Sequence, residues 1–178
     1  LCRTVGDNRC SATRIYILRT AHFNAAMAPN GMMVVWSGLL LRTRNEAELA
    51  TVLGHEFAHF DKQHSLQSFR DLKAKTDAMT WLTFVPGGMF AQLGLFGSVF
   101  QFNRDMERQS DMQALRYLAQ SGYDPKAASQ IWEQLRAEMD ATKKGRLIRR
   151  VQDAEDNFFA SHPSSKQRMD YLSAAASK

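Results

Sequence analysis

Three residues within five positions have the types and spacing of a catalytic metal site. His55, Glu56 and His59 follow the pattern H-E-x-x-H. On a helix, the two imidazoles lie one turn apart on the same face and can bind one zinc ion. Zinc lowers the pKa of a bound water to about 7, and the glutamate takes the released proton and passes it to the leaving amine of a peptide bond. The pattern therefore predicts peptide hydrolysis, provided that a helix and a third ligand surround it.

The residues around this pattern predict the required helix. Asn45 is a typical N-cap residue, and Glu46 and Glu48 favour the first turn of a helix. The apolar residues that follow recur at helical spacing: Leu49, Val52, Leu53, Phe57 and Phe60. We therefore expect His55 and His59 on one face of a helix that begins near residue 45.

A second pair of residues offers the third ligand. Glu107 and Asp111 are also four positions apart, on a helix predicted over residues 101–120. Glu107 is the candidate ligand, and Asp111 is the candidate acceptor for the free N–H of a ligating histidine. The alternative is that both carboxylates pair with Arg104 and Arg108 on a solvent-exposed face.

The two other histidines outside the terminal region are expected to lie away from the metal. His64 follows His59 by five residues, which places it about 140° around the same helix. Near the C-terminus of that helix, a cationic imidazole is favoured. For His22 we expect a structural role.

The whole chain predicts a mainly helical α+β fold with a small N-terminal β-sheet. Residues 1–178 are enough for a single domain with a buried core. Strands are expected at 14–19 and 32–37, with a turn at 29–31 between them. Further helices are expected at 65–79, 101–120, 125–140 and 164–175. The polar residues 141–157 are predicted to form a mobile loop.

Residues 78–102 contain no charged side chain and are long enough to span a bilayer. His59 and Glu107 flank this segment and must meet at one ion, so a single crossing would leave them on opposite sides of the membrane. Two crossings require about 40 residues. A buried hairpin, an interfacial segment at a membrane surface and a flap over the cleft remain open.

Composition limits the classes of partner. The chain is 44% hydrophobic and 23% charged, with a net charge of +5, as is ordinary for a globular protein. Its densest basic run, residues 143–150, has no interleaved aromatic residue, so a solvated loop is favoured over an anionic partner surface. Nucleic acid binding is not indicated.

The two cysteines, Cys2 and Cys10, lie close together near the start of the chain. A disulfide between them is favoured over two free thiols and would imply an oxidising compartment. Two cysteines alone would leave a tetrahedral zinc site half empty. The chain begins at Leu1 without an initiator methionine, which indicates a trimmed or mature fragment.

These motifs resemble the HtpX-like and CAAX prenyl endopeptidase-like family of zinc metallopeptidases, most closely its soluble periplasmic or lipoprotein members. The matching segments run in order along nearly the whole chain: Asn24-Ala25, Gly38-Leu39-Leu40, and residues 46–65, 103–111 and 162–168. The resemblance implies a gluzincin-type zincin domain. Its zinc ligands would be His55, His59 and Glu107, with Glu56 as the base and Asp111 behind the ligands.

The resemblance also implies roles for three further positions. His162, followed by proline, would either stabilise the oxyanion or occupy the open metal position and keep the enzyme latent; a turn residue that caps the last helix is the structural alternative. Arg168 would form a salt bridge that holds this loop, and it is also expected among the substrate-binding residues. Ser110 stands where the family usually has alanine, a change expected to leave the chemistry untouched.

Substrate binding is expected at the strand of residues 32–37. The resemblance suggests that this strand is a sheet edge to which a peptide adds as a further strand. Met33, Val34 and Val35 would then contact the substrate.

Together, the motifs and the resemblance predict a zinc endopeptidase with one Zn²⁺ per chain and polypeptide substrates. Unfolded or misassembled proteins of the bacterial periplasm or cell envelope are the expected substrates, and contact with a membrane surface is left open. The alternative is a latent or non-proteolytic, chaperone-like scaffold with a zinc site; the intact Glu56 argues against it, because a scaffold needs no base. A different zinc hydrolase, such as an amidase, would predict a closed pocket for a small molecule.

Overall fold

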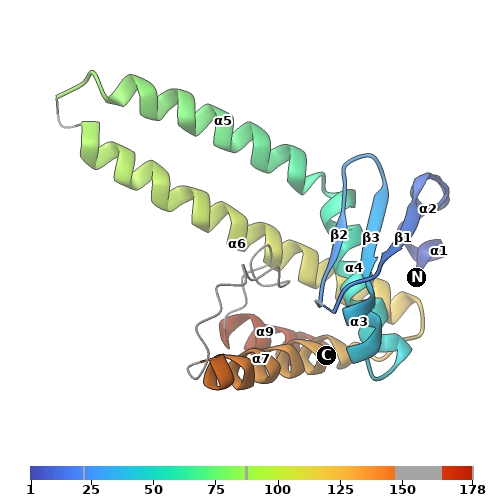
Figure 1. The fold of residues 1–178 in the computed structure, drawn as a ribbon. Helices are drawn as coiled ribbons and strands as arrows, with labels where there is room; N and C mark the ends of the chain where they lie inside the picture. The colour runs from blue at the N-terminus through green and yellow to red at the C-terminus, as the bar shows by residue number, and fades with distance from the viewer. Residues whose placement is uncertain (22, 87, 147–165, 178) are drawn as a thin grey trace.

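The structure, a computed structural model, describes all residues of the chain except 22, 87, 147–165 and 178. Its elements confirm a mainly helical α+β fold with a small sheet near the N-terminus (Figure 1). The helices and strands are α1 (Cys2–Val5), α2 (Asp7–Ala12), β1 (Arg14–Leu18), β2 (Ala25–Met27), β3 (Met32–Trp36), α3 (Ser37–Arg42), α4 (Glu46–Asp61), α5 (His64–Leu82), α6 (Gly88–Gln120), α7 (Ala127–Arg146) and α9 (Lys166–Ala176).

The three-stranded sheet has the order β1-β3-β2. β3 pairs in parallel with β1 and antiparallel with β2, so both of its edges are occupied. The expectation that residues 32–37 form a sheet edge is therefore wrong. Met33 and Val35 are buried in the core, which leaves these two side chains no room to bind a substrate strand, and Val34 is half-buried.

The turn predicted at residues 29–31 joins β2 to β3. The Gly31 N–H donates to the Ala28 carbonyl and the Ala28 N–H donates to the Met32 carbonyl, at 3.0 and 2.8 Å. Gly31 has φ +85°, and a Cβ atom added to it would lie 2.6 Å from the Ala12 carbonyl oxygen. Only glycine fits this turn without strain.

Helix α4 begins where the sequence predicts. The Asn45 side chain accepts from the Glu48 N–H at 2.9 Å, and the buried Glu48 carboxylate accepts from the backbone N–H and the Nε of Arg44, each at 2.7 Å. These bonds satisfy amide groups that lack a partner at the start of a helix. They fix the start of the helix that carries the H-E-x-x-H pattern.

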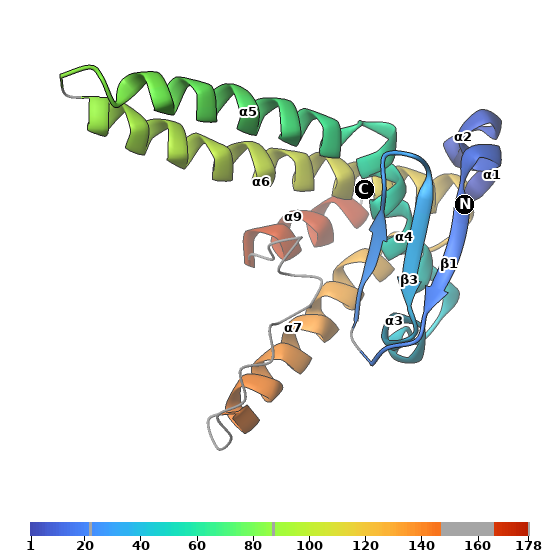
Figure 2. The same cartoon turned by 45° about the horizontal axis from the view of Figure 1, so that its top comes forward.

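Helix α4 lies at the centre of the molecule. The sheet covers one side of it, and α6 and α7 pack on the other sides (Figure 2). The largest fully buried side chains come from the sheet and these helices and include Met33, Leu39, Leu118, Ile131 and Trp132. The metal-binding pattern is thus held inside the hydrophobic core rather than on a surface helix.

The uncharged residues 78–102 form the end of α5, the connection to α6 and the first part of α6. α5 and α6 run side by side away from the rest of the molecule (Figures 1 and 2). Among the described residues, none of the helices combines the length and the apolar character that a bilayer crossing requires. At the tip, Trp81, Phe84 and Val85 are 76%, 79% and 53% exposed, so this end of the hairpin is not buried in the core.

The remaining elements differ from the prediction mainly at their ends. α6 begins at Gly88, well before residue 101, and α7 continues to Arg146. The loop predicted for 141–157 is therefore wrong for residues 141–146, and its remainder lies outside the described residues. Cys10 is disulfide-bonded, in agreement with the favoured bridge.

Candidate metal centre

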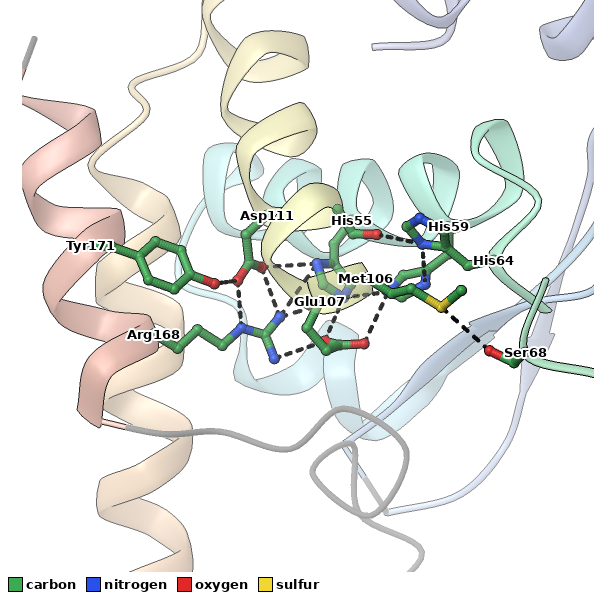
Figure 3. Close-up of polar contacts among 10 residues, drawn as sticks. His55, His59, His64, Ser68, Met106, Glu107, Asp111, Arg168 and Tyr171 are labelled. Atoms are coloured by element: carbon green, nitrogen blue, oxygen red, sulfur yellow. Dashed lines mark hydrogen bonds and ion pairs between the residues drawn. The ribbon is translucent and has the colours of Figure 1, made fainter. Parts of the chain in front are cut away.

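Helices α4 and α6 bring three metal-binding side chains together. α4 places His55 and His59 one turn apart, and α6 directs Glu107 toward them (Figure 3). One donor atom from each residue lies within 4.8 Å of the others. The helix and the acidic side chain that the H-E-x-x-H pattern requires therefore lie together in the structure.

The spacing of the donor atoms fits zinc. Nε2 of His59 lies 3.0 Å from Nε2 of His55 and 3.1 Å from Oε1 of Glu107. Nε2 of His55 lies 3.3 Å from Oε2 of Glu107. In a tetrahedral site with bonds of about 2.1 Å, ligand atoms lie about 3.4 Å apart. Two imidazoles and one carboxylate are also a common donor set for catalytic zinc, in which a fourth position stays open.

Asp111 holds the imidazole of His55 from behind. Its Oδ1 lies 3.0 Å from Nδ1 of His55, so a proton on Nδ1 leaves the lone pair of Nε2 for a metal. Burial alone would lower the pKa of His55, but the carboxylates of Glu107 and Asp111 outweigh it and raise this pKa to about 9. In the metal-free protein, these buried carboxylates therefore favour the protonated form of His55.

Arg168 approaches the same cluster from α9 (Figure 3). Its Nη1 lies 2.9 Å from Oε2 of Glu107, and its Nε and Nη2 donate to the two oxygens of Asp111. Tyr171 donates to the same Asp111 carboxylate, and the Arg168 guanidinium lies 4.9 Å from the ring centroid of Trp132. Arg168 thus forms ion pairs with carboxylates at the metal centre. Its expected roles in holding the loop of His162 and in substrate contact stay predictions, because that loop lies outside the described residues.

The acidic pair on α6 is buried rather than solvated. Glu107 is 7% exposed and Asp111 is 2% exposed. Burial alone would raise the pKa of Asp111, but the charge of Arg168 outweighs it and holds this pKa below its ordinary value. The alternative in which Glu107 and Asp111 pair with Arg104 and Arg108 on a solvent-exposed face is therefore wrong.

Glu56 lies beside the ligands on α4 and is also buried. It follows His55 directly, so its side chain leaves the helix about 100° away from that of His55. Its direction therefore differs from the one that His55 and His59 share. This placement suits a group that acts on a reactant at the metal rather than one that binds the metal itself.

His64 is a buried neighbour of the site that the sequence reasoning placed wrongly. Its Nδ1 lies 3.0 Å from Nδ1 of His59 and 3.1 Å from Oγ of Ser110. α4 ends at Asp61, Gln63 adopts a left-handed conformation, and His64 is the first residue of α5, so the angle expected for one continuous helix does not apply. Burial lowers the pKa of His64, which favours the neutral imidazole over the expected cation.

A cavity of about 200 Å³ lies beside His59. Met27 of β2, Pro29, Phe60 of α4 and Leu66 of α5 contribute to its lining. The cavity therefore lies between β2, an edge strand of the sheet, and the candidate metal ligand His59. His162 and His22, for which a catalytic or latency role and a structural role were expected, lie outside the described residues.

Residues 8–176 match peptidase family M48. The mitochondrial metalloendopeptidase OMA1 of Schizosaccharomyces pombe is 31% identical over 162 residues, which are 87% of this chain and 44% of that protein. OMA1 of Arabidopsis thaliana is 31% identical over 153 residues, 85% of this chain and 29% of that protein. The beta-barrel assembly-enhancing protease of Yersinia pestis is 26% identical over 134 residues, 67% of this chain and 27% of that protein.

The fold and the cluster of two histidines and a glutamate define a zincin-like metallopeptidase domain. The chain belongs to peptidase family M48, and the family resemblance inferred from the motifs is confirmed. It spans less than half the length of these curated relatives.

Proposed function

We propose that this chain is the catalytic domain of a zinc-dependent endopeptidase. The cluster of His55, His59 and Glu107 carries the proposal, because its donor atoms have the types and the spacing of a catalytic zinc site. Membership of peptidase family M48 supports the same activity. One zinc ion per chain is the expected stoichiometry.

The residues around the metal have distinct roles in this proposal. Zinc held by His55, His59 and Glu107 would supply Lewis-acid chemistry. Glu56 acts as the general base, which takes a proton from the attacking water and delivers it to the leaving amine. Asp111 keeps the proton of His55 on Nδ1, away from the metal side.

The substrate strand is assigned to the outer edge of β2, which pairs with no strand other than β3 in the part of the chain that the structure describes. Within the antiparallel pair, the carbonyl of Asn24 accepts from the Trp36 N–H at 3.0 Å. Because this direction alternates along a strand, Ala25 and Met27 direct their backbone N–H and C=O groups away from β3. The Met27 side chain also lines the cavity beside His59. A peptide added to this edge would therefore pass close to the metal centre.

The tip of the α5–α6 hairpin is assigned to contact with a membrane surface. Trp81, Phe84 and Val85 are exposed at an end of the molecule that projects away from the core (Figure 2). Aromatic and aliphatic side chains at such a tip can insert into the interface of a bilayer, where tryptophan is favoured. This contact would hold the catalytic domain at the membrane surface.

The substrates are assigned to unfolded or misassembled proteins of the bacterial envelope, with the domain in the periplasm or at a membrane of the envelope. The name of the Yersinia pestis relative, a beta-barrel assembly-enhancing protease, supports this class. A substrate can add to a strand edge only through an extended segment of its chain, and unfolded proteins offer such segments. The disulfide at Cys10 agrees with an oxidising compartment.

A latent form closed by His162 is a separate proposal, for which His162→Ala should raise proteolysis.

The test is casein cleavage by the wild type, Glu56→Gln and the control Glu133→Gln, with zinc content assayed on each. Glu133 is exposed on α7, so its replacement should change neither quantity. We expect zinc in all three proteins and loss of cleavage in Glu56→Gln alone. Zinc without cleavage in the wild type would favour the latent or scaffold alternative, and the absence of zinc from all three would contradict the proposal.

A further inference from the structure

His64 lies behind the candidate ligand His59, on the side opposite the metal centre. Nε2 of His59 faces His55 and Glu107, whereas its Nδ1 lies 3.0 Å from Nδ1 of His64 (Figure 3). Oγ of Ser110, which α6 supplies, lies 3.1 Å from the same nitrogen of His64. His64 and Ser110 are both buried. Side chains from α4, α5 and α6 thus meet directly behind one metal ligand.

We propose that His64 is a positioning residue for the metal site, because its Nδ1 accepts the Nδ1–H of His59 and fixes the ring with which His59 binds the metal. This inference rests on the proposed zinc site. An imidazole that binds a metal through Nε2 carries its remaining proton on Nδ1, and that N–H requires an acceptor in a buried site. Carboxylates and carbonyls usually accept it; here a neutral imidazole does so.

The geometry selects one tautomer of His64. If its Nδ1 carried a proton, two N–H donors would face each other across 3.0 Å when His59 binds a metal. The proton of His64 must therefore lie on Nε2. That atom is buried and makes no hydrogen bond of ordinary geometry within the described residues, so the contacts of Nδ1 decide between the two tautomers.

Ser110 reinforces this choice. Its hydroxyl can donate to Nδ1 of His64 at 3.1 Å. It would share the single lone pair of that nitrogen with the N–H of His59, and a nitrogen whose lone pair is used in this way cannot carry a proton of its own. Ser110 was expected to leave the chemistry untouched. The contact gives it an indirect role instead, in which the hydroxyl keeps His64 in the form that accepts from His59.

Zinc affinity tests this role. We would titrate metal-free wild type, His64→Leu, His64→Asn and Ser110→Ala with zinc in competition with a chromophoric chelator. Loss of the acceptor in His64→Leu should weaken binding by roughly ten- to a hundredfold. Asparagine offers a carbonyl oxygen near the position of Nδ1 and should restore most of the affinity. Ser110→Ala should have a smaller effect in the same direction, and the control Ser129→Ala, whose buried hydroxyl donates to the Lys126 carbonyl, should have none.

The thermal midpoint of the metal-free proteins separates positioning from simple packing. A packing role would lower this midpoint in His64→Leu and leave zinc affinity equal to that of the wild type, which would overturn the inference. An equal loss of zinc affinity in His64→Leu and His64→Asn would also overturn the inference. Absence of zinc binding by the wild type would instead contradict the zinc site itself.

A second measurement does not depend on a folded variant. In zinc-loaded wild type labelled with ¹⁵N-histidine, Nδ1 of His64 should give the chemical shift of an unprotonated ring nitrogen, and Nδ1 of His59 and Nε2 of His64 should give those of protonated ones. A protonated Nδ1 on His64 would overturn the inference.

Discussion

The guanidinium of Arg168 forms a two-point ion pair with the carboxylate of Asp111, with Nε 2.6 Å from Oδ2 and Nη2 2.7 Å from Oδ1. The same Asp111 carboxylate contacts the candidate ligand His55. Arg168 of α9 therefore holds Asp111, which in turn contacts the candidate ligand His55 on α4. Arg168 and His55 are far apart in the sequence. This arrangement makes the docking of α9 part of the metal site.

Removal of Arg168 should destabilise the protein strongly. Arg168→Met would remove the guanidinium that pairs with the buried carboxylates of Asp111 and Glu107, and breaking such a buried ion pair typically costs about 3–5 kcal/mol. The exposed pair of Lys73 and Asp77 supplies the control, because Lys73→Met should change stability by less than about 1 kcal/mol. Urea unfolding of the metal-free proteins measures both changes, and equal effects would contradict a structural role for the Arg168 pair.

Asp111→Ala should lower zinc affinity by about ten- to a hundredfold, because His55 would lose the acceptor that fixes its tautomer. Chelator competition on protein that remains folded by circular dichroism measures the change. Asp105→Ala is the control, since Asp105 is exposed on the same helix and should bind zinc as the wild type does. Unchanged affinity in Asp111→Ala would remove Asp111 from the metal site.

The metal-free protein should lose stability as the solution becomes alkaline. Although burial opposes it, the carboxylates of Glu107 and Asp111 raise the pKa of His55 to about 9, above the value of about 6.5 in an unfolded chain. Protonated His55 therefore adds to the free energy of unfolding. This contribution is fully present below about pH 6.5 and is lost as the pH rises through the pKa that His55 has in the folded protein. Urea unfolding in the presence of a chelator at pH 6.5 and at higher pH measures this loss. A flat profile that His55→Gln does not alter would contradict the ion pairs at this residue.

The hairpin tip should bind lipid. Trp81→Ser combined with Phe84→Ser should reduce cosedimentation with vesicles of phosphatidylethanolamine and phosphatidylglycerol, because the inserted apolar area is lost. Leu41 is 82% exposed on α3, so Leu41→Ser is a control for the removal of an exposed apolar side chain elsewhere. If the control and the double variant behave alike, the assignment of the tip to a membrane surface is wrong.

The sequence predicted the members of the metal cluster because the spacing within each helix is local, and the need for a third ligand then joined the two helices. His55 with His59, and Glu107 with Asp111, each share a helix face that a four-residue interval defines. The start of α4 was equally readable, because Asn45 and Glu48 form its cap through bonds within three or four residues. In both cases, short-range geometry determines the structure.

What the sequence could not reveal depends on contacts between distant segments. β2 has only three residues and shows no alternating pattern, so the sequence does not predict it, and the family resemblance alone suggests β3 as a sheet edge. His64 was misplaced because the left-handed conformation of Gln63 ends α4, and glutamine carries no signal for such a break. The i, i+5 pair of His59 and His64 becomes a contact only across this change of direction.

Anomalous diffraction at the zinc edge, on crystals of the zinc-loaded protein, tests the metal centre most directly. The expected result is one anomalous peak between Nε2 of His55, Nε2 of His59 and the carboxylate of Glu107, at about 2.0–2.2 Å from each donor atom. A peak at other residues, or no peak in protein that contains zinc, would contradict the site on which the proposed peptidase activity depends.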